Sequence, residues 1–412
     1  MGKIELDHTG SGGGITLSSD GTDLLLDGTA IGGGGASLEL YAENYVSATT
    51  PAATGDESVA IGNDAQATNL WAFAVGRSAR ATGSQSIAIG RQTLASNTLS
   101  TAIGFDAAAS SLYATSIGMN SSAGGSRANT GTAAMALGGS NASGTDSFAA
   151  AIANNTSSYG ATGANSIAIG KQASASSTEA VAIGGNFQTA SATYSSTIGG
   201  TFNTNQGSRA IIAGGQSNTI DIAAQYSVIV GGNNNNVTGE RGVIVGGANN
   251  EANASHTFAT GEYAKAAEIG KLARATGRFS ADGDAQGGQF ILRADTTDAT
   301  ATVLTTNNST AGTTNQIVAA SDTCITFDGT ITAMQNGAQA YASWKIEGLL
   351  VNDGGTTSLV NSATTVISNA DGWGMALSAD TGNNALAITV TGEASHNIRW
   401  VANIRTTEVT YA

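Results

Sequence analysis

The chain has 412 residues, 56 of them glycine, with one proline, one cysteine and only 11% charged residues. Its formal net charge of −14 argues against binding nucleic acid through the phosphate backbone, and the single cysteine, Cys324, excludes an internal disulfide framework and a cysteine-based metal site. No apolar run is long enough for a transmembrane helix, and residues 1–7 lack the apolar core of a secretory signal. We therefore expect neither membrane insertion nor a signal peptide.

The charge divides the chain into three regions. Residues 1–60 carry nine acids and one base (net −8), residues 61–260 carry seven of each (net 0), and residues 261–412 carry fourteen acids and eight bases (net −6), which together give −14. In the first region, residues 13–31 favour short strands with hairpin turns at Asp20-Gly21 and Asp27-Gly28. The sole proline, Pro51, can stop strand pairing before the middle region begins.

The middle of the chain repeats one short motif. It appears at residues 58–62 as Ser-Val-Ala-Ile-Gly and returns at 72–76, 86–90 and 100–104, so that the closing glycines are 14 residues apart. The register slips after residue 118, the 14-residue step returns at 166–170 and 180–184, and from residue 199 the motif becomes Gly-Gly followed by Asn. Alternation of large and small side chains is typical of a strand, and glycine permits a tight turn after it.

Each repeat predicts one flattened coil. A second short stretch between the motifs, such as residues 65–68, supplies a second strand and a second turn. Successive coils then stack in parallel about 4.8 Å apart. The amides of residues 233–236 and 249–250, one repeat apart, are expected to stack into a hydrogen-bonded ladder.

Side-chain size predicts which residues face outward. Sheets separated by large side chains lie about 10 Å apart, which turns of two or three residues do not span. We therefore expect a small interior set, Ala60, Ala88, Ala168 and Ala182, and a large outward set, Val59, Ile61, Ile87, Ile89, Ile167, Ile169, Val181 and Ile183. An exposed aliphatic stripe needs covering, and cyclic self-association covers it most simply. The alternative is a wider monomeric solenoid with Ile and Val inside.

The coils resemble the head repeats of trimeric autotransporter adhesins, through the Ser-Val-Ala-Ile-Gly motifs and the Ala-x-Ala-Thr-Gly stretches between them. The Gly-Gly-x-x-Asn copies over residues 199–250 resemble a variant in the same heads. The resemblance implies a homotrimeric left-handed parallel β-roll of 14–15-residue coils. The outward aliphatic residues would form the trimer core.

The two ends resemble phage fibre proteins. Residues 283–286, 290–293, 296–300, 377–381, 390–394, 398–402 and 406–409 resemble the end domain of phage tail fibres. Residues 13–17 through 39–44 are similar to fibre proteins of marine cyanobacterial phages. The resemblance implies a virion appendage that attaches by its N-terminus to other tail or capsid proteins and meets a host-surface receptor, such as a glycan, through its C-terminus.

The last part of the chain predicts an antiparallel β-sandwich tip of jelly-roll type. Strand-like runs cover residues 289–294, 315–320, 323–333, 338–351, 357–367, 373–379, 385–392 and 397–411. Trp344 and Trp400 lie in alternating runs and are expected in the core, with a ligand platform as the alternative, whereas Trp373 follows a turn and fits either role. The predicted division is an N-terminal β attachment region (1–50), the roll (51–262), a collar (263–286) and the tip (287–412).

Residues with catalytic chemistry are sparse, and we predict no catalytic residue, metal or cofactor. His8, His256 and His396 fall in three different regions, no nucleophile-elbow motif occurs, and the acids of the roll are scattered singly although glycan cleavage needs a pair. Around the collar, the bases Lys265, Lys271, Arg274 and Arg278 are expected to pair with Glu262, Glu268, Asp282 and Asp284. The expected receptor contacts are tip-loop residues Asn352, Asp353, Asn369, Asp371 and Trp373.

These observations favour a non-enzymatic fibre that binds no nucleic acid. Three alternatives stay open. They are a capsid- or tail-attached decoration fibre without receptor binding, a tailspike glycan depolymerase, and a bacterial adhesin, the last disfavoured because no export signal is seen.

Overall fold

The computed structural model describes residues 49–119, 131–150, 159–337, 340–369 and 372–411, together with the backbone of short strands at 4–6, 15–19, 24–26, 29–30, 37–40 and 128–129. These residues form strands and turns without a helix, which confirms the all-β class, and nothing helical in them could cross a membrane. The chain divides into two compact units, Met1–Asn165 and Ser166–Ala412.

The first strands of unit 1 form a small antiparallel sheet. β1 (Ile4–Leu6), β2 (Ile15–Ser19), β3 (Leu24–Leu26) and β4 (Thr29–Ala30) pair in chain order. This confirms the short strands expected over residues 13–31, while the turn residues Asp20, Gly21, Asp27 and Gly28 lie outside the described part. β5 (Ser37–Leu40) pairs in parallel with β7 (Ser58–Ile61), so coil stacking already begins before Pro51.

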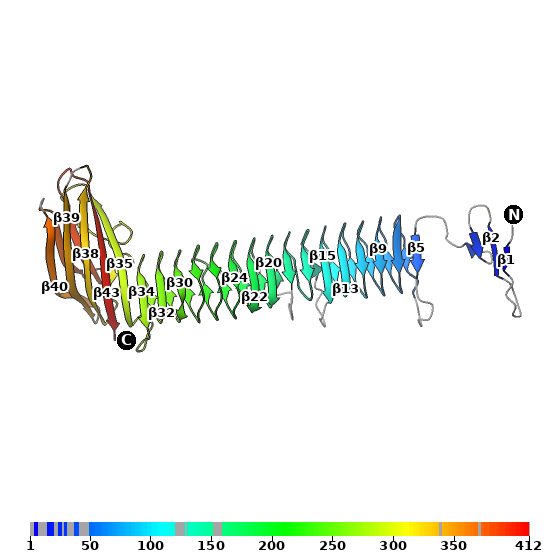
Figure 1. The fold of residues 1–412 in the computed structure, drawn as a ribbon, viewed down its shortest axis with the longest axis horizontal. Coiled ribbons are helices and arrows are strands. Elements are labelled where there is room, and N and C mark those ends of the chain that lie inside the picture. Colours follow the sequence, from blue (N-terminus) through cyan, green and yellow to red (C-terminus); the bar gives the residue numbers. More distant parts are fainter. Residues whose placement is uncertain are drawn as a thin grey trace. The chain divides into compact units, whose positions relative to one another are not determined.

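The coils of unit 1 stack in parallel along two sheets (Figure 1). The long strands after β7 are β9 (Phe73–Val75), β11 (Ile87–Ile89), β13 (Thr101–Phe105), β15 (Thr115–Met119), β17 (Met135–Leu137) and β18 (Phe148–Ala150). The short strands are β6 (Ala52–Ala53), β8 (Gln66–Ala67), β10 (Arg80–Ala81), β12 (Leu94–Ala95), β14 (Ala108–Ala109), β16 (Ala128–Asn129) and β19 (Gly160–Ala161). The 14-residue repeat sets the register, since Ala88 lies beside both Ala74 and Ala102.

Unit 2 continues the same pattern. Its long strands are β20 (Ile167–Lys171), β22 (Val181–Asn186), β24 (Ser196–Ile198), β26 (Ile211–Ile212), β28 (Val228–Ile229), β30 (Val243–Ala248), β32 (Phe258–Glu262) and β34 (Leu272–Thr276). Its short strands are β21 (Ser174–Ala175), β23 (Thr189–Ala190), β25 (Thr204–Asn205), β27 (Thr219–Ile220), β29 (Asn236–Val237), β31 (Glu251–Ala252) and β33 (Lys265–Ala266). The described parts of the two units contain a β-solenoid of about 15 turns, and its stacking extends into the segment predicted as a collar.

The interior of the early coils is alanine, as expected. Ala60, Ala88, Ala168 and Ala182 have no exposed surface. The expectation is wrong for the coils between residues 210 and 252, where Ile212, Ile220, Ile229, Val237 and Ile244 are fully buried inside. Gly242 helps to make room for them, because a Cβ at this position would lie 2.5 Å from Cγ1 of Val237.

A ladder of buried asparagines explains the Gly-Gly-x-x-Asn variant. Asn203, Asn218, Asn235 and Asn250 are fully buried and stack one coil apart. The Asn235 amide donates to the carbonyl of Gly231 in its own coil (3.0 Å) and to that of Gly247 in the next coil (3.1 Å). Its Oδ1 accepts the Asn250 amide at 3.0 Å, so the predicted ladder over residues 233–236 and 249–250 is confirmed. The backbone N–H of Asn235 donates to Oδ1 of Asn218 in the preceding coil, so this asparagine bonds to the coils on both sides.

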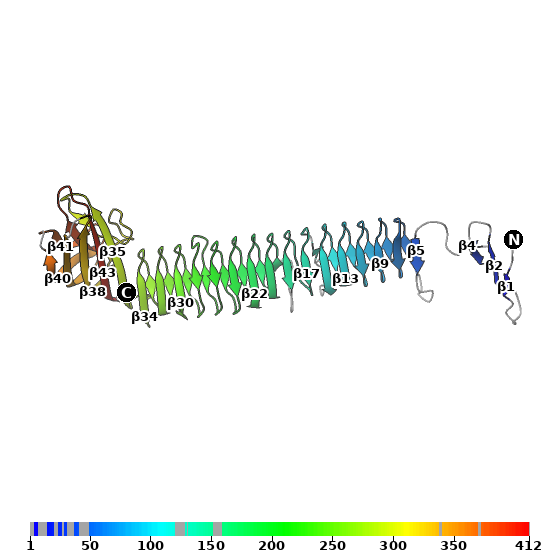
Figure 2. The same cartoon turned by 45° about the horizontal axis from the view of Figure 1, so that its top comes forward.

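The roll of unit 2 leads directly into a large antiparallel sheet (Figure 2). β34 pairs with β35 (Ala285–Thr296), and the sheet continues through β43 (Ile398–Thr410), β38 (Thr323–Gln335), β39 (Tyr341–Asp353) and β40 (Thr356–Asn369). A second sheet contains β36 (Thr302–Val303), β37 (Ile317–Val318) and β41 (Gly374–Asp380), all paired to β42 (Ala385–Thr391). The roll and the tip therefore share one hydrogen-bonded sheet.

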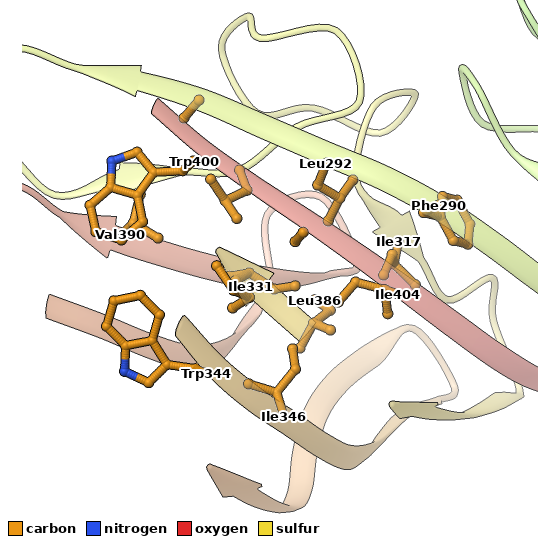
Figure 3. Close-up of a cluster of buried hydrophobic side chains, with 14 of the residues drawn as sticks. Phe290, Leu292, Ile317, Ile331, Trp344, Ile346, Leu386, Val390, Trp400 and Ile404 are labelled. Carbon is orange, nitrogen blue, oxygen red and sulfur yellow. The ribbon is translucent and has the colours of Figure 1, made fainter. Parts of the chain in front are cut away.

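One hydrophobic core joins the two tip sheets. Figure 3 shows Trp344 and Trp400 of the large sheet in one buried cluster with Leu386 and Val390 of β42. Trp344, Trp373 and Trp400 are all buried, which confirms the core role expected for Trp344 and Trp400. Each of the eight predicted strand-like runs contains a strand, whereas β36 was missed because two residues carry no alternating pattern.

Two adjacent glycines provide a test of the coil geometry. Gly247 has a φ of +91°, and a Cβ there would lie 1.8 Å from the carbonyl oxygen of Gly261, whereas a Cβ on Gly246 would meet nothing within 4 Å. We expect Gly247→Ala to destabilise the chain by about 2 kcal/mol or more. The matched Gly246→Ala should stay within about 0.5 kcal/mol of the original chain in denaturant unfolding followed by circular dichroism. Equal effects of the two substitutions would contradict the described stacking.

Candidate functional site

The long strands and the residues directly after them carry a row of outward apolar side chains, most of them aliphatic, here named the apolar stripe. Among the eight residues predicted to point outward, Ile87 is exposed and Val59, Ile61, Ile89, Ile167, Ile169, Val181 and Ile183 are half-buried. Further members are Phe73, Val75, Ile103 and Ile117 in unit 1 and Ile198, Ile211, Val230 and Val245 in unit 2. Ile117 in β15 is 41% exposed, and Val230, which directly follows β28, is 49% exposed. The apolar stripe is therefore available for contact within each unit.

The opposite sheet of the coils has a different character. The outward residues of its short strands are mostly polar: Gln66, Arg80, Ser174, Thr189, Thr204, Thr219, Asn236, Glu251 and Lys265. Most coils thus present one apolar and one polar outer face. Large contiguous apolar patches are rarely left uncovered at protein surfaces, so the long-strand face is the candidate interaction surface.

The predicted receptor contacts fall in two separate places. Asn352 and Asp353 end β39, where Asp353 pairs with Thr356 at the start of β40. Asn369 lies at the other end of β40, a strand of 14 residues, so roughly 40 Å separates the two groups. Asp371 lies outside the described residues. The structure does not bring these residues together as one site.

Two of the predicted contacts have buried side chains, which corrects the prediction for them. Asn352 is 1% exposed and donates to the Ala319 carbonyl at 2.8 Å. Trp373 is 3% exposed, and its ring centroid lies 5.7 Å from that of Trp400. Asn369 is half-buried and binds the Trp373 backbone through its side-chain amide, which leaves Asp353 as an exposed member of the set. The alternation along β39 places Asn352 on the inward side with Leu350, a signal that could have identified its burial.

A buried charge cluster lies where the roll meets the tip. The Lys271 ammonium is 3.2 Å from a Glu268 carboxylate oxygen and 2.8 Å from one of Glu408. Gln286 and Thr406 also donate to Glu408, at 2.8 and 2.6 Å. Lys271 and Glu268 are both among the collar charges that the sequence predicts to pair, without assigned partners. Glu408 was missed, because 137 residues separate it from Lys271.

The other expected collar pairs are realised in part. Arg278 pairs with Asp282 at 2.5 Å, as expected. Lys265 instead pairs with Glu251 of the preceding coil at 3.3 Å. Asp284 accepts backbone N–H groups of Phe279, Ser280 and Ala281, so it shapes a turn and is not an ion-pair partner in this arrangement.

The pKa values of the two carboxyl groups beside Lys271 shift in opposite directions. Burial raises the pKa of Glu268 above its usual range, because the attraction to Lys271 is too weak to offset it. Burial acts in the same sense on Glu408, but attraction to Lys271 and the hydrogen bonds it accepts outweigh burial and lower the pKa. For Lys271 itself, burial is outweighed by the attraction to Glu408 and Glu268, and the pKa is raised. The ammonium therefore stays charged and Glu408 is its principal partner.

The described residues assemble no group of three or more His, Cys, Asp or Glu side chains that could hold a metal ion. His256 is exposed at a turn of the roll, and His396 lies 3.5 Å from Glu393 in the tip. His8 lies outside the described residues.

Comparisons with known proteins bear on the coils. The family model described as "YadA head domain repeat (2 copies)" matches residues 53–69, 72–93, 95–121 and 161–186, which confirms the head-repeat resemblance over those segments. No curated protein matches the chain by sequence.

Two solved structures show a weak similarity. One is a tailspike protein, gp49, of the Acinetobacter baumannii bacteriophage Fri1, described as a capsular polysaccharide depolymerase. It is 10% identical with a TM-score of 0.23, and the match covers 85% of this chain and 59% of the tailspike. The other is the tailspike protein of the Acinetobacter phage vB_ApiP_P1, 10% identical with a TM-score of 0.17, and the match covers 82% of this chain and 78% of that one. Similarities of this size support no inference about activity.

The opposite pKa shifts generate a prediction for pH. Because the folded pKa of Glu268 lies above its unfolded value, folding takes up a proton there, and the contribution of this group to stability falls as pH rises between the two values. We expect Glu268→Gln to remove this decline and to be at least as stable as the original chain at about pH 8. Denaturant unfolding followed by tryptophan fluorescence at about pH 5 and pH 8 measures the free energy of unfolding of both chains.

Glu408→Gln is the matched comparison. The folded pKa of Glu408 is lowered, so its stabilisation is present at neutral pH and is lost as pH falls through the folded value. We expect this substitution to cost about 2–3 kcal/mol at neutral pH. If both substitutions changed stability in the same direction, the assignment of Glu408 as the principal partner of Lys271 would be wrong.

Proposed function

We propose that the chain forms a non-enzymatic homotrimeric fibre on a phage particle, with the apolar stripe at the centre of the trimer. The observation that carries the proposal is the outward placement of aliphatic residues in the long strands, from Val59 to Val245. The alanine-filled early coils leave Val59, Ile87, Ile167 and their equivalents no room inside. The match to an adhesin head repeat supports three copies around one axis, with left-handed rolls.

The energy available from the apolar stripe is sufficient for association. Full burial of a Val or Ile side chain contributes about 1.5–3 kcal/mol. Half of that gain, summed over the eight predicted trimer-core residues, is comparable to the roughly 4–15 kcal/mol that association costs. The other members of the apolar stripe add to it.

The ends of the chain have separate roles in this proposal. Residues 1–50 attach the trimer to other virion proteins, residues 51–262 and the collar act as a spacer, and residues 287–412 form a sandwich tip that meets a host-surface receptor. β40 supports a contact role for the tip, since it is the strand farthest from β34 across the sheet. It contains no charged residue, and Val360, Val366 and Ile367 are each more than half exposed.

Charges placed in the apolar stripe should prevent assembly. We expect the double variant Ile167→Lys/Ile169→Lys to be monomeric, because six ammonium groups would meet at the axis of a trimer. The control Ser174→Lys/Thr189→Lys adds the same charge to the polar face and should remain trimeric. Analytical ultracentrifugation gives the mass of each. A trimeric Ile167→Lys/Ile169→Lys variant would exclude the apolar stripe as the interface.

The non-enzymatic part of the proposal is tested with the full chain and bacterial surface polysaccharides. We expect the protein to retain polysaccharide in a pull-down assay and to release no new reducing ends during prolonged incubation. Release of oligosaccharides would instead make the chain a depolymerase and overturn this part of the proposal.

A further inference from the structure

A column of tyrosine and arginine side chains runs along one edge of the unit 2 roll. Tyr194, Arg209, Tyr226 and Arg241, here named the Tyr–Arg ladder, each occupy the same turn position, two residues before a long strand begins. Backbone bonds connect successive rungs: Arg209 N–H donates to Thr193 O at 3.1 Å, and Tyr226 N–H to Ser208 O at 3.0 Å. The position lies outside the strands that form the apolar stripe.

The side chains of the Tyr–Arg ladder stack on one another. The Arg209 guanidinium carbon lies 5.1 Å from the ring centroid of Tyr194 and 5.6 Å from that of Tyr226. The Arg241 guanidinium carbon lies 5.2 Å from the centroid of the same Tyr226 ring. A guanidinium cation is attracted to the face of an aromatic ring, so the four side chains hold each other in an ordered row.

The composition of this row is not explained by the turn. All four residues have positive φ angles, between 57° and 60°, a conformation that favours Gly or Asn. The same position elsewhere in the roll holds Gln85, Asn165 and Glu179 as well as Trp71 and Tyr113, all with a similar φ, so the turn itself does not require a ring or a guanidinium. Large side chains at this position in four successive coils point to contact with something outside the chain.

The Tyr–Arg ladder is accessible and offers free hydrogen-bond donors. Tyr194 and Tyr226 are each 44% exposed, and both arginines are exposed. Within the described residues Arg209 forms no ion pair, while Arg241 pairs with Glu240 at 2.6 Å. The surrounding region, residues 61–260, carries seven acids and seven bases and so does not repel an anion as the acidic ends would.

We infer that the Tyr–Arg ladder binds an extended acidic polysaccharide with one carboxylate on every second sugar. The chain would lie along the roll edge, with the apolar C–H faces of its neutral sugars on Tyr194 and Tyr226 and its carboxylates on Arg209 and Arg241. Rungs follow the strand spacing of about 4.8 Å, close to the length of one pyranose ring in an extended chain, and the arginines occupy every second rung. A guanidinium binds a carboxylate with two parallel hydrogen bonds. The inference goes beyond the proposed function, because it adds a polysaccharide contact on the roll to the receptor contact of the tip, and it rests on the proposed fibre for its setting.

The test uses the full chain and hyaluronan, a polysaccharide with glucuronate on alternate sugars, beside the same polymer after its carboxyl groups are reduced to alcohols. Biolayer interferometry should show binding of hyaluronan that weakens with added salt, and no binding of the reduced polymer. Arg209→Gln/Arg241→Gln should weaken hyaluronan binding by about tenfold or more. The control Arg80→Gln/Lys171→Gln removes two charges outside the ladder and should stay within about twofold of the original chain.

Further measurements separate binding from folding and from assembly. The variant Arg209→Lys/Arg241→Lys keeps the charge but loses the planar guanidinium, so it should also bind hyaluronan more weakly. It replaces the glutamine variant in the test if that variant fails to fold. Thermal melting and sedimentation of every variant show whether the coils and the oligomer are intact. A trimer that does not bind hyaluronan, or that binds it equally well without both arginines, overturns the ladder assignment and leaves the proposed trimer standing. A monomeric original chain would instead contradict the proposed function.

Discussion

The narrow interior of the coils is the constraint on which the rest of the structure depends. Short turns hold the two strands of each coil close together, and in the early coils only alanine fits between them, as the full burial of Ala60 and Ala88 shows. Strand alternation then leaves Ile87 and its equivalents no position except the outside. Side-chain size inside one coil thus determines the character of the outer face of the roll, and with it the surface available for assembly.

The roll of unit 2 also needs an end that does not expose its last strands. A stack of parallel strands ends in unpaired backbone groups and an open core, which invite association. Here β35 pairs with β34 in antiparallel fashion and carries the sheet onward into the tip. The cluster of Lys271, Glu268 and Glu408 lies at this transition, where charges from the last coil and from β43 satisfy one another. The tip is therefore a continuation of the roll that closes it.

Periodicity was sufficient to predict most of the fold. The repeats led to the parallel coils, the small interior and the asparagine ladder, and turn signals separated the tip strands, because each of these features is local in sequence. The inward position of Ile212, Ile229 and Ile244 was missed. It depends on the room available inside these coils, which includes the space left by the missing side chain of Gly242. The Glu408 contact was missed because its partner is distant in the chain. Asn352 was predicted as a receptor contact because it begins a turn signal, whereas strand alternation places its side chain inward, where it is buried.

The most direct test of the account is the mass of the unmodified full chain in solution, measured by sedimentation equilibrium over a range of concentrations in mild buffer. The account predicts a single species of about three times the 40.6 kDa chain mass. A species that stays at the mass of one chain at all concentrations would mean that the aliphatic face of the coils needs no partner, and the central claim would be lost.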